Sequence, residues 1–430
     1  MHLRRGVSMA GFGVHSEVGR LKTVLVHRPG RSLERLTPQN RSEYLFDDVV
    51  WVERAQREHD YFTDVLRDRG VEVLYLQQLL AEALAASEDA RSHIVERAVS
   101  SFTVGLSLVE ELRGWLYSQE PSRLAEILVG GLLISELDGL DLDRLNRHSL
   151  GALLATPDSF VLPPLPNSLF MRDSSAWIYG GVILPPLFWH ARRLEVSNVS
   201  EIYRHHPKFV AEKFDFWYPP AGDAERFAVE DFGHGASLEG GDVMPIGNKT
   251  VLVGMGERST GRMVEHIARA LFASGQAERI IACRMELARA YMHLDTVIGF
   301  VDRDAVTIYP QVIEQMQVFS LRPGHDGSTF DITEEAGLLP AIADALDVRE
   351  LRVIPTGGDS FQAAREQWDD ANNVVAIEPG VVVAYARNTR TNANLRAAGV
   401  EVIEIEGSEL GKGRGGCHCM TCPIAREGLA

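Results

Sequence analysis

The sequence predicts an α/β fold in which five similar units stack around a central axis. From residue 160 onward, a polar motif, a strand, a tight turn and a second strand recur four times, and helical sequence then follows. Residues 21–76 form a fifth, related unit of strand, loop, helix and strand. Repeated supersecondary units are typical of rotational stacking, in which equivalent positions of the repeats meet at the centre.

An open, doubly wound sheet is the alternative architecture. The tight turns between paired strands indicate hairpins, and hairpins join antiparallel neighbours. A doubly wound sheet is mostly parallel instead. We therefore favour stacking around an axis.

The size and composition of the chain exclude several classes of protein. The chain has 430 residues, of which 45% are hydrophobic and 24% charged, as in ordinary globular proteins. Its net charge of −17 argues against a nucleic-acid surface, which needs a basic face. We find no apolar run long enough to cross a membrane and no signal peptide. Few, clustered cysteines suit free thiols in a reducing compartment. We expect a cytoplasmic protein that binds neither nucleic acid nor membrane.

The first part of the chain predicts one α/β unit followed by a helical insertion. Residues 21–27 and 71–76 predict strands, and a helix runs through Ala55 and Leu66. Four later segments carry helical apolar spacing: 79–84, 94–99, 108–116 and 124–133. We predict that residues 77–156 form a bundle of four or five helices inserted between two parts of the α/β domain, residues 1–76 and 157–430. No reactive cluster appears in this bundle, so we expect it to form a lid wall or an oligomer surface.

The four later repeats each begin with polar residues and continue as two strands. The motifs occupy residues 167–173, 238–242, 293–295 and 356–359. The paired strands are expected at 176–179 and 182–184, 243–246 and 251–253, 297–300 and 306–309, and 374–377 and 381–383. Arg192, Arg258 and Asn388 recur just ahead of the helix that follows.

Acids and a histidine stand at equivalent positions of these repeats, namely Asp173, Glu239, Asp242, His293 and Asp295. Each alone has an ordinary explanation, such as a helix cap or a turn. Buried together, they need cationic partners, and Arg172 is the one basic side chain in the motifs besides the histidine. We therefore expect a bound cation. Both a metal ion and a planar guanidinium, whose fork of N–H donors matches carboxylates, fit this pattern.

A glycine-rich loop at residues 411–423 carries three of the four cysteines and a histidine. Three interpretations compete: a nucleophilic cysteine, a metal site built from Cys417, His418, Cys419 and Cys422, and simple packing. We rank the nucleophile first, because a tetrahedral metal site normally takes a second pair of ligands from a distant segment. A cysteine thiolate can attack a guanidinium carbon, and a histidine can protonate departing ammonia and then deprotonate water.

Together, these motifs resemble those of the arginine deiminase family. The similar segments are Gly-Val-His-Ser-Glu at 13–17, Leu-Phe-Asp-Asp-Val at 45–49, Phe-Met-Arg-Asp at 170–173, Leu-Glu-Gly-Gly-Asp at 238–242, His-Leu-Asp at 293–295 and His-Cys-Met-Thr-Cys-Pro at 418–423. The resemblance spans nearly the whole chain. It implies a fivefold pseudosymmetric α/β propeller of ββαβ repeats that hydrolyses L-arginine to L-citrulline and ammonia in arginine catabolism, with no metal and no cofactor.

The resemblance also implies a role for each site residue. Cys419 would be the nucleophile and form a covalent thiouronium intermediate. His293 would act as general acid and then as base, with Glu239 beside it. Asp173 and Asp295 would clamp the guanidinium. The remaining residues would bind the amino-acid end or gate the site: Asn167, Arg192 and Arg258 at the α-carboxylate, Phe170 and Leu45 along the substrate, and Arg414 as a mobile gate.

Some features leave alternatives open. Cys417 stands where the family pattern leads us to expect a glycine. The rival functions are other guanidine-modifying enzymes of the same fold: an agmatine deiminase, a dimethylarginine hydrolase or an amidinotransferase. Arg192 and Arg258 argue against agmatine, which has no carboxylate to bind. A non-catalytic zinc-binding module is the alternative from another class. We expect a homo-oligomer, either a dimer or a tetramer.

Overall fold

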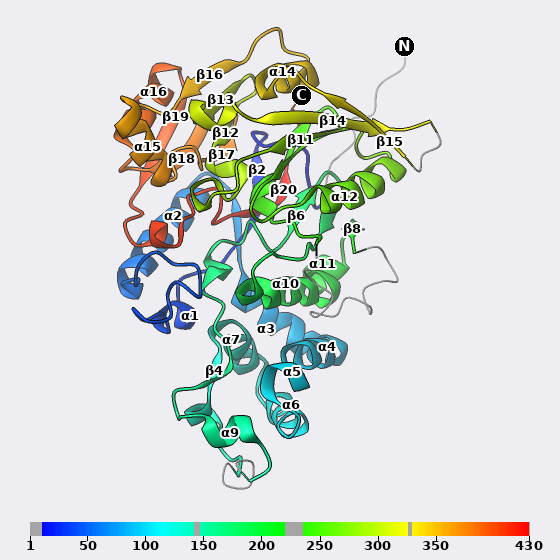
Figure 1. The fold of residues 1–430 in the computed structure, drawn as a ribbon, viewed down its shortest axis with the longest axis vertical. Helices are drawn as coiled ribbons and strands as arrows, with labels where there is room; N and C mark the ends of the chain where they lie inside the picture. Colours follow the sequence, from blue (N-terminus) through cyan, green and yellow to red (C-terminus); the bar gives the residue numbers. More distant parts are fainter. Residues whose placement is uncertain (1–10, 142–146, 220–234, 326–328, 430) are drawn as a thin grey trace.

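The computed structural model describes residues 11–141, 147–219, 235–325 and 329–429 (Figure 1). Within these ranges, five sheets share one pattern: two antiparallel strands, the second of which pairs in parallel with a third strand. In each, a helix lies between the second and third strands in the chain. These sheets are separate and mixed, so the alternative of one doubly wound sheet is wrong.

Four of the sheets follow one another along the chain, as the repeats predict. They are β6 (Ala176–Ile178), β7 (Gly181–Ile183) and β8 (Asp215–Tyr218); β9 (Val243–Gly247), β10 (Thr250–Met255) and β11 (Arg279–Arg284); β12 (Ile298–Asp302), β13 (Ala305–Ile308) and β16 (Arg352–Pro355); and β17 (Val375–Glu378), β18 (Val381–Tyr385) and β19 (Glu401–Ile405). The hairpin β14 (Gln317–Pro323) and β15 (Phe330–Glu334) widens the second sheet beyond β11.

The fifth sheet joins the two ends of the chain. β2 (Leu21–Val26) pairs in parallel with β3 (Glu72–Tyr75) after helix α2 (Val52–Asp68), as expected for the N-terminal unit. Its antiparallel neighbour is β20 (Cys422–Arg426), which also carries β1 (Gly13–Val14) on its other edge. The last strand therefore completes the first unit, and it begins only three residues after Cys419.

Neighbouring sheets contact one another mostly between their first strands, although one of these contacts joins the first strand β17 to β2, the second strand of its sheet. β6 contacts β20 on one side and β9 on the other, β12 contacts β17, and β17 contacts β2. The short 3-10 turns η6 (Gly240–Asp242) and η8 (Leu294–Thr296), which carry polar motifs, also touch. The starts of the repeats therefore lie close together in space.

Helices cover the sheets and form a separate group at one end of the molecule (Figure 1). The covering helices are α10 (Arg193–His205), α11 (Pro207–Val210), α12 (Gly261–Ala273), α13 (Pro310–Ile313), α14 (Leu338–Leu346), α15 (Ser360–Trp368) and α16 (Thr389–Ala397), and α1 (Arg31–Glu34) lies after β2. The group at the end comprises α3 (Leu76–Ala86), α4 (Glu88–Ala98), α5 (Ser101–Val104), α6 (Val109–Tyr117), α7 (Pro121–Gly130) and α9 (Leu150–Leu154). Its leucines pack with Val199 and Ile202 of α10 in one core cluster. No described helix has both the length and the hydropathy that a membrane crossing requires.

Two local predictions need correction. Helix α7 ends at Gly130 rather than continuing to residue 133, because Gly131 adopts a positive φ of 79°. Leu132–Leu133 instead form strand β4, paired with β5 (Phe160–Leu162). The polar motif of the last repeat is also not at residues 356–359, which lie between β16 and α15. Residues 370–373 directly precede β17 and occupy that position.

Candidate active site

Cys419 lies in the loop between the 3-10 turn η9 (Leu410–Gly413) and β20, and its side chain is buried. The amide of Asn373 holds this loop from two sides. Its Nδ2 donates to Sγ of Cys419 at 3.1 Å, and its Oδ1 accepts from the backbone N–H groups of Cys419 at 2.9 Å and Gly416 at 3.1 Å. The thiol is therefore fixed relative to the start of β17.

The glycines of the loop permit its close packing. A Cβ atom at Gly415 would lie 2.4 Å from the ring of Phe170, and one at Gly416 would lie 2.7 Å from the carbonyl oxygen of Asn373. Such contacts are far shorter than van der Waals distances, so any other residue would displace the loop. The aromatic ring of Phe170 thus lies directly against the segment that presents Cys419.

A buried histidine–carboxylate group lies at the starts of the first three of the four later repeats. Nε2 of His293 is 2.7 Å from Oε2 of Glu239, and its Nδ1 is 3.6 Å from Oδ1 of Asp173. Gly241 keeps this group compact, because a Cβ there would lie 2.8 Å from Nδ1 of His293. Its backbone N–H also donates to Oδ1 of Asp173 at 3.1 Å. The Gly-Gly-Asp turn therefore positions both the imidazole and the carboxylate.

Two buried arginines supply the positive charge that these acids need. Nη1 of Arg192 donates to Oδ2 of Asp173 at 2.6 Å and lies 3.4 Å from Oε2 of Glu239. Nη1 of Arg258 donates to the same Glu239 oxygen at 3.1 Å. The expectation that too few cations face these acids is therefore wrong. Both arginines were predicted at the amino-acid end of the substrate, and the structure places them against the acids.

A second network of charged side chains, made of Asp295, His418 and Glu17, lies next to Cys419. Oδ2 of Asp295 is 3.4 Å from Sγ of Cys419 and 2.8 Å from Nδ1 of His418. Nε2 of His418 is in turn 3.1 Å from Oε2 of Glu17, near the N-terminus. Because His418 lies between two carboxylates, it orients Asp295 toward the thiol.

The environment shifts the protonation of these groups. Burial opposes ionisation of Glu239, but Arg258, the His293 hydrogen bond and Arg192 outweigh it and lower its pKa. For His293, burial favours the neutral ring, yet Asp173 and Glu239 raise its pKa to about 9. Burial, reinforced by Asp295 and Asp173, raises the pKa of the Cys419 thiol well above its ordinary range. The unliganded site therefore holds an imidazolium and a neutral thiol at pH 7.

Asn167 and Leu45 were predicted at the amino-acid end of the substrate, and both make hydrogen bonds to other segments of the chain. Asn167 donates through Nδ2 to the Tyr44 carbonyl at 2.7 Å, and its own carbonyl accepts from Arg192 at 3.3 Å. Leu45 has a positive φ of 65°, and its carbonyl accepts from Arg289 at 2.8 Å.

Arg414 points away from the acids. Its guanidinium lies 3.5 Å from the centre of the Trp368 ring, and Nη1 donates to the Trp368 carbonyl at 2.7 Å. Among the described side chains, no ion pair joins it to Asp173, Glu239 or Asp295. Arg414 also has a positive φ of 66°. Within the described ranges, neither its side chain nor that of Leu45, Phe170 or Asn167 is hydrogen-bonded to the acid cluster. Asn167 reaches that cluster through the hydrogen bond of its backbone carbonyl with Arg192.

The cysteine loop does not assemble as a metal site. His418 faces Asp295 and Glu17, whereas Sγ of Cys422 faces Ser175 Oγ at 3.4 Å and Tyr203 Oη at 3.9 Å. Cys417 is buried in a hydrophobic cluster, and burial followed by the charge of Asp370 raises the pKa of its thiol. The loop ligands therefore point in different directions, and the metal interpretation of this loop is wrong.

Sequence reasoning missed three contributors. Asn373 was overlooked because the motif of the last repeat was placed too early. Its position directly before β17, equivalent to Asp295 before β12, was the available signal. Glu17 and His418 lie inside segments similar to the family; the sequence suggested no role for Glu17 and only that of a metal ligand for His418.

Comparisons with known proteins place this site in a family. The sequence model described as "Arginine deiminase" matches residues 42–426. An arginine deiminase of Rhodococcus erythropolis is 46% identical over 419 residues, and the match covers 97% of this chain and 98% of that protein. The chain belongs to the arginine deiminase family. The resemblance drawn from the motifs is thereby confirmed.

Solved structures show that the family fold is shared more widely. An amidinotransferase from Microseira wollei in saxitoxin biosynthesis has a TM-score of 0.55 at 12% identity, covering 97% of this chain and 98% of that one. The N-terminal domain of a cyanobacterial arginine dihydrolase, bound to product, has a TM-score of 0.51 at 13% identity, covering 95% and 99%. The DDAH of Pseudomonas aeruginosa, in complex with citrulline, has a TM-score of 0.50 at 15% identity, covering 94% and 100%. At these identities the likeness shows a common mixed α/β fold and nothing finer.

Proposed function

We propose that this protein is an arginine deiminase, a hydrolase that converts L-arginine and water to L-citrulline and ammonia. The observation that carries the proposal is the nearly full-length match to the Rhodococcus enzyme. The site supports it independently, because a buried thiol, the carboxylates of Asp173 and Asp295 and an imidazolium lie together. That set of groups matches a planar cation that a nucleophile must attack.

We assign substrate recognition to the acids. Asp173 and Asp295 clamp the two edges of the guanidinium, since carboxylates pair with its N–H groups in a fork geometry. Arg192 and Arg258 bind the α-carboxylate, with Asn167 beside them, once the substrate guanidinium competes with Arg192 for Asp173. Phe170 and Leu45 line the amino-acid end. Arg414 acts as a gate whose resting position is on Trp368.

Cys419 is the nucleophile in this proposal. The bound guanidinium lowers the cost of a thiolate next to Asp295, so the thiol ionises when substrate arrives and its proton passes to solvent, where it later protonates the released ammonia. The sulfur then attacks the guanidinium carbon and forms a C–S bond. His293 gives a proton to the departing nitrogen, ammonia leaves, and a cationic thiouronium remains on Cys419.

Hydrolysis completes the cycle. His293, now neutral, takes a proton from a water molecule, and the resulting hydroxide adds to the thiouronium carbon. The C–S bond breaks, the hydroxyl proton passes to the departing sulfur and restores the thiol, and the carbon keeps the oxygen as the ureido carbonyl of citrulline. Glu239 holds the imidazole through its 2.7 Å hydrogen bond and favours the protonated ring in the first half-reaction. Proton and electron counts balance without a metal or cofactor.

The finer architecture is also part of the proposal. Five sheets of one topology, with contacts between neighbouring sheets, support a fivefold pseudosymmetric propeller. The helical group that packs on α10 supports a separate inserted domain at residues 77–156, between propeller parts 1–76 and 157–430.

We further propose a cytoplasmic homo-oligomer, a dimer or a tetramer. Large apolar side chains on the helical insertion support an oligomer surface, because Phe102 is 89% exposed and Leu106 is 87% exposed.

A substrate panel tests the function. Purified protein is assayed for ammonia release from L-arginine, agmatine, dimethylarginine and L-citrulline, with citrulline formation as a second readout. We expect kcat/KM for L-arginine to exceed that for every other compound by at least a hundredfold. A higher kcat/KM with agmatine or dimethylarginine would assign one of the related activities instead.

A further inference from the structure

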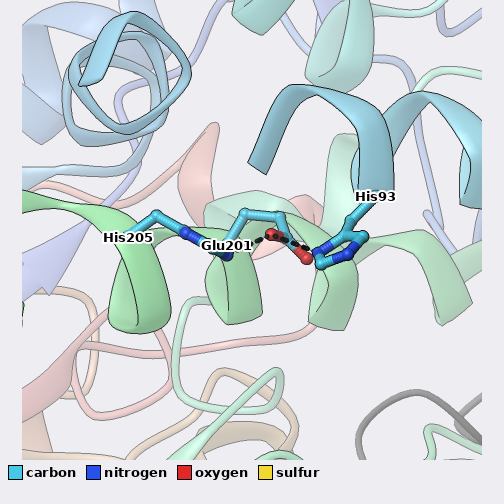
Figure 2. Close-up of side chains that lie close together, drawn as sticks. All are labelled: His93, Glu201 and His205. Carbon is cyan, nitrogen blue, oxygen red and sulfur yellow. Dashed lines mark ion pairs between the residues drawn. The ribbon is translucent and has the colours of Figure 1, made fainter. Parts of the chain in front are cut away.

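A cluster of side chains that can bind a metal ion lies away from the candidate active site, where the inserted helix α4 packs on α10. It consists of His93 from α4 and Glu201 and His205 from α10. One ligand atom from each residue lies within 4.8 Å of the other two. Glu201 and His205 are four residues apart and so share one face of α10. Figure 2 shows the ring of His93 reaching that face from the neighbouring helix.

We propose that His93, Glu201 and His205 bind one divalent transition-metal ion of the zinc class. Two imidazoles and one carboxylate, completed by water, are a donor set that Zn²⁺ prefers over Mg²⁺ or Ca²⁺. The site joins the helical insertion to the α/β part of the molecule. The sequence predicted no reactive cluster in the insertion. That prediction missed this site because the partners of His93 lie about a hundred residues further along the chain.

The spacing of the ligand atoms fits such an ion. Atoms bound at about 2.0–2.1 Å to a tetrahedral centre lie about 3.3 Å apart. Oε2 of Glu201 is 3.3 Å from Nε2 of His205 and 3.9 Å from Nδ1 of His93. The second distance needs only a small adjustment. His93 can supply it, because its side chain is 53% exposed and free to change rotamer.

Glu201 gives an independent reason to expect a ligand. Its side chain is 2% exposed, yet Oε2 accepts no hydrogen bond from any described residue. A buried carboxylate oxygen without a donor is costly. The nearby charge of Arg204 does not remedy this, because its guanidinium donates to Ser200 Oγ and stacks 4.2 Å from the Phe216 ring centre. A cation between the two imidazoles would satisfy this oxygen.

Ser87 prepares His205 for metal binding. Nδ1 of His205 lies 3.1 Å from Oγ of Ser87, the residue that caps α4 by accepting from the N–H of Ala90. A proton on Nδ1, donated to Ser87, leaves the lone pair of Nε2 directed at Glu201. Metal-binding histidines commonly have their second nitrogen held in this way. The bound ion and this hydrogen bond would together fasten α4 to α10.

Calorimetric titration of the full-length protein with Zn²⁺, after removal of bound metal by a chelator, tests the proposal. The variants are His93→Ala and His93→Gln, and the matched control is His266→Ala, another exposed histidine on a helix. We expect wild type and His266→Ala to bind one more Zn²⁺ ion per chain than either His93 variant does. If the His93 variants still bind that additional ion, we expect their affinity for it to be at least tenfold weaker. Zinc that binds the catalytic thiol or acids contributes equally to all four proteins and cancels.

Thermal unfolding provides the second readout. Zn²⁺ should raise the melting temperature of wild type and His266→Ala but not of the His93 variants, since an ion that binds only the folded state stabilises it. Without metal, the His93 variants should melt close to wild type, because the side chain is exposed. Equal zinc stoichiometry and affinity in wild type and both His93 variants would overturn the site, and so would a wild-type protein that binds no zinc.

Discussion

Nη1 of Arg192 donates to Oδ2 of Asp173 at 2.6 Å, and both side chains are almost completely buried. The carboxylate assigned to the substrate guanidinium thus already holds a guanidinium of the chain. Arg192 is also held by Glu195, through Nη2 at 2.8 Å and Nε at 3.0 Å. Arginine binding therefore exchanges one guanidinium for another on Asp173, while Glu195 keeps Arg192 inside the site.

A crystal structure of the Cys419→Ala variant with L-arginine tests this exchange. We expect the substrate guanidinium to bind Asp173, and Nη1 of Arg192 to leave Asp173 for the substrate carboxylate while its bond to Glu195 persists. The unliganded variant, crystallised in the same form, is the control. If bound arginine left the Arg192–Asp173 pair intact, Asp173 would not be the clamp.

Substitution of Gly241 should disable the site without a change in its chemistry. In Gly241→Ala, the new methyl group would lie 2.8 Å from Nδ1 of His293 and 3.1 Å from Oδ1 of Asp173. One of them must move, and a displacement of about 1 Å typically costs about a hundredfold in rate. We expect kcat to fall by about that factor.

Gly114→Ala is the control for Gly241→Ala, because Gly114 lies in helix α6 with no heavy atom near its Cβ position. It should leave kcat unchanged and raise the free energy of unfolding by about 0.5–1 kcal/mol. Equal kcat in the two variants would show that the contacts of Gly241 do not set the geometry.

Asn373 and Asn372 form a matched pair of buried amides. Asn373 bonds the thiol and the backbone of the cysteine loop, whereas Asn372 bonds the hydroxyls of Thr307 and Thr356. Replacing either with alanine should cost about 1–3 kcal/mol of stability by leaving buried groups unpaired. Only Asn373→Ala should also lower kcat, by tenfold or more, because it releases Cys419. Steady-state kinetics below the melting range of both variants would separate the effects, and equal kcat values would remove Asn373 from the site.

The pKa of His293 predicts a pH dependence. Carboxylates raise this pKa to about 9, above the ordinary value of 6.5. The stabilising contribution of the imidazolium is therefore complete below pH 6.5 and is lost as the pH rises through about 9. We expect the ring nitrogens of His293 to titrate near pH 9 by NMR.

Glu239→Gln should lower the pKa of His293, because it removes the charge 2.7 Å from Nε2. The alkaline decline of activity should move to lower pH in the same variant. A midpoint near 6.5 in wild type, or an unmoved midpoint in Glu239→Gln, would contradict the charge assignment.

Local patterns in the sequence predicted much of the fold. Apolar runs divided by turns, such as those around Gly247 and Gly380, were sufficient to place the hairpins, because register and turn chemistry are local properties. The pairing of β20 with β2 was not predicted, since nothing local links strands that lie about four hundred residues apart. The Gly-Gly-Asp sequence at 357–359 resembles that at 240–242, but α15 separates it from β17, so it does not begin the last repeat.

The sequence predicted which residues meet at the centre of the repeats, but it did not predict which of them pair with one another. Asp173, Glu239 and His293 stand at equivalent repeat positions, so their convergence follows from the repeat. The sequence could not reveal that Arg192 would contact Asp173, because the direction of a long side chain depends on the packed environment. Asn373 carries no charge and belongs to no reactive pattern, so its position before β17 was the one sequence signal, and its distance to Cys419 shows what it contacts.

The central claim is that Sγ of Cys419 bonds to the guanidinium carbon of arginine. Acid quenching during turnover, followed by peptide mapping with mass spectrometry, tests it directly. We predict an adduct of arginine minus ammonia on the peptide that contains Cys419, localised to that residue by fragmentation. The adduct should be absent from Cys419→Ser, which should form no citrulline. An adduct on Cys417 or Cys422, or citrulline formation at the wild-type rate by Cys419→Ser, would contradict the account.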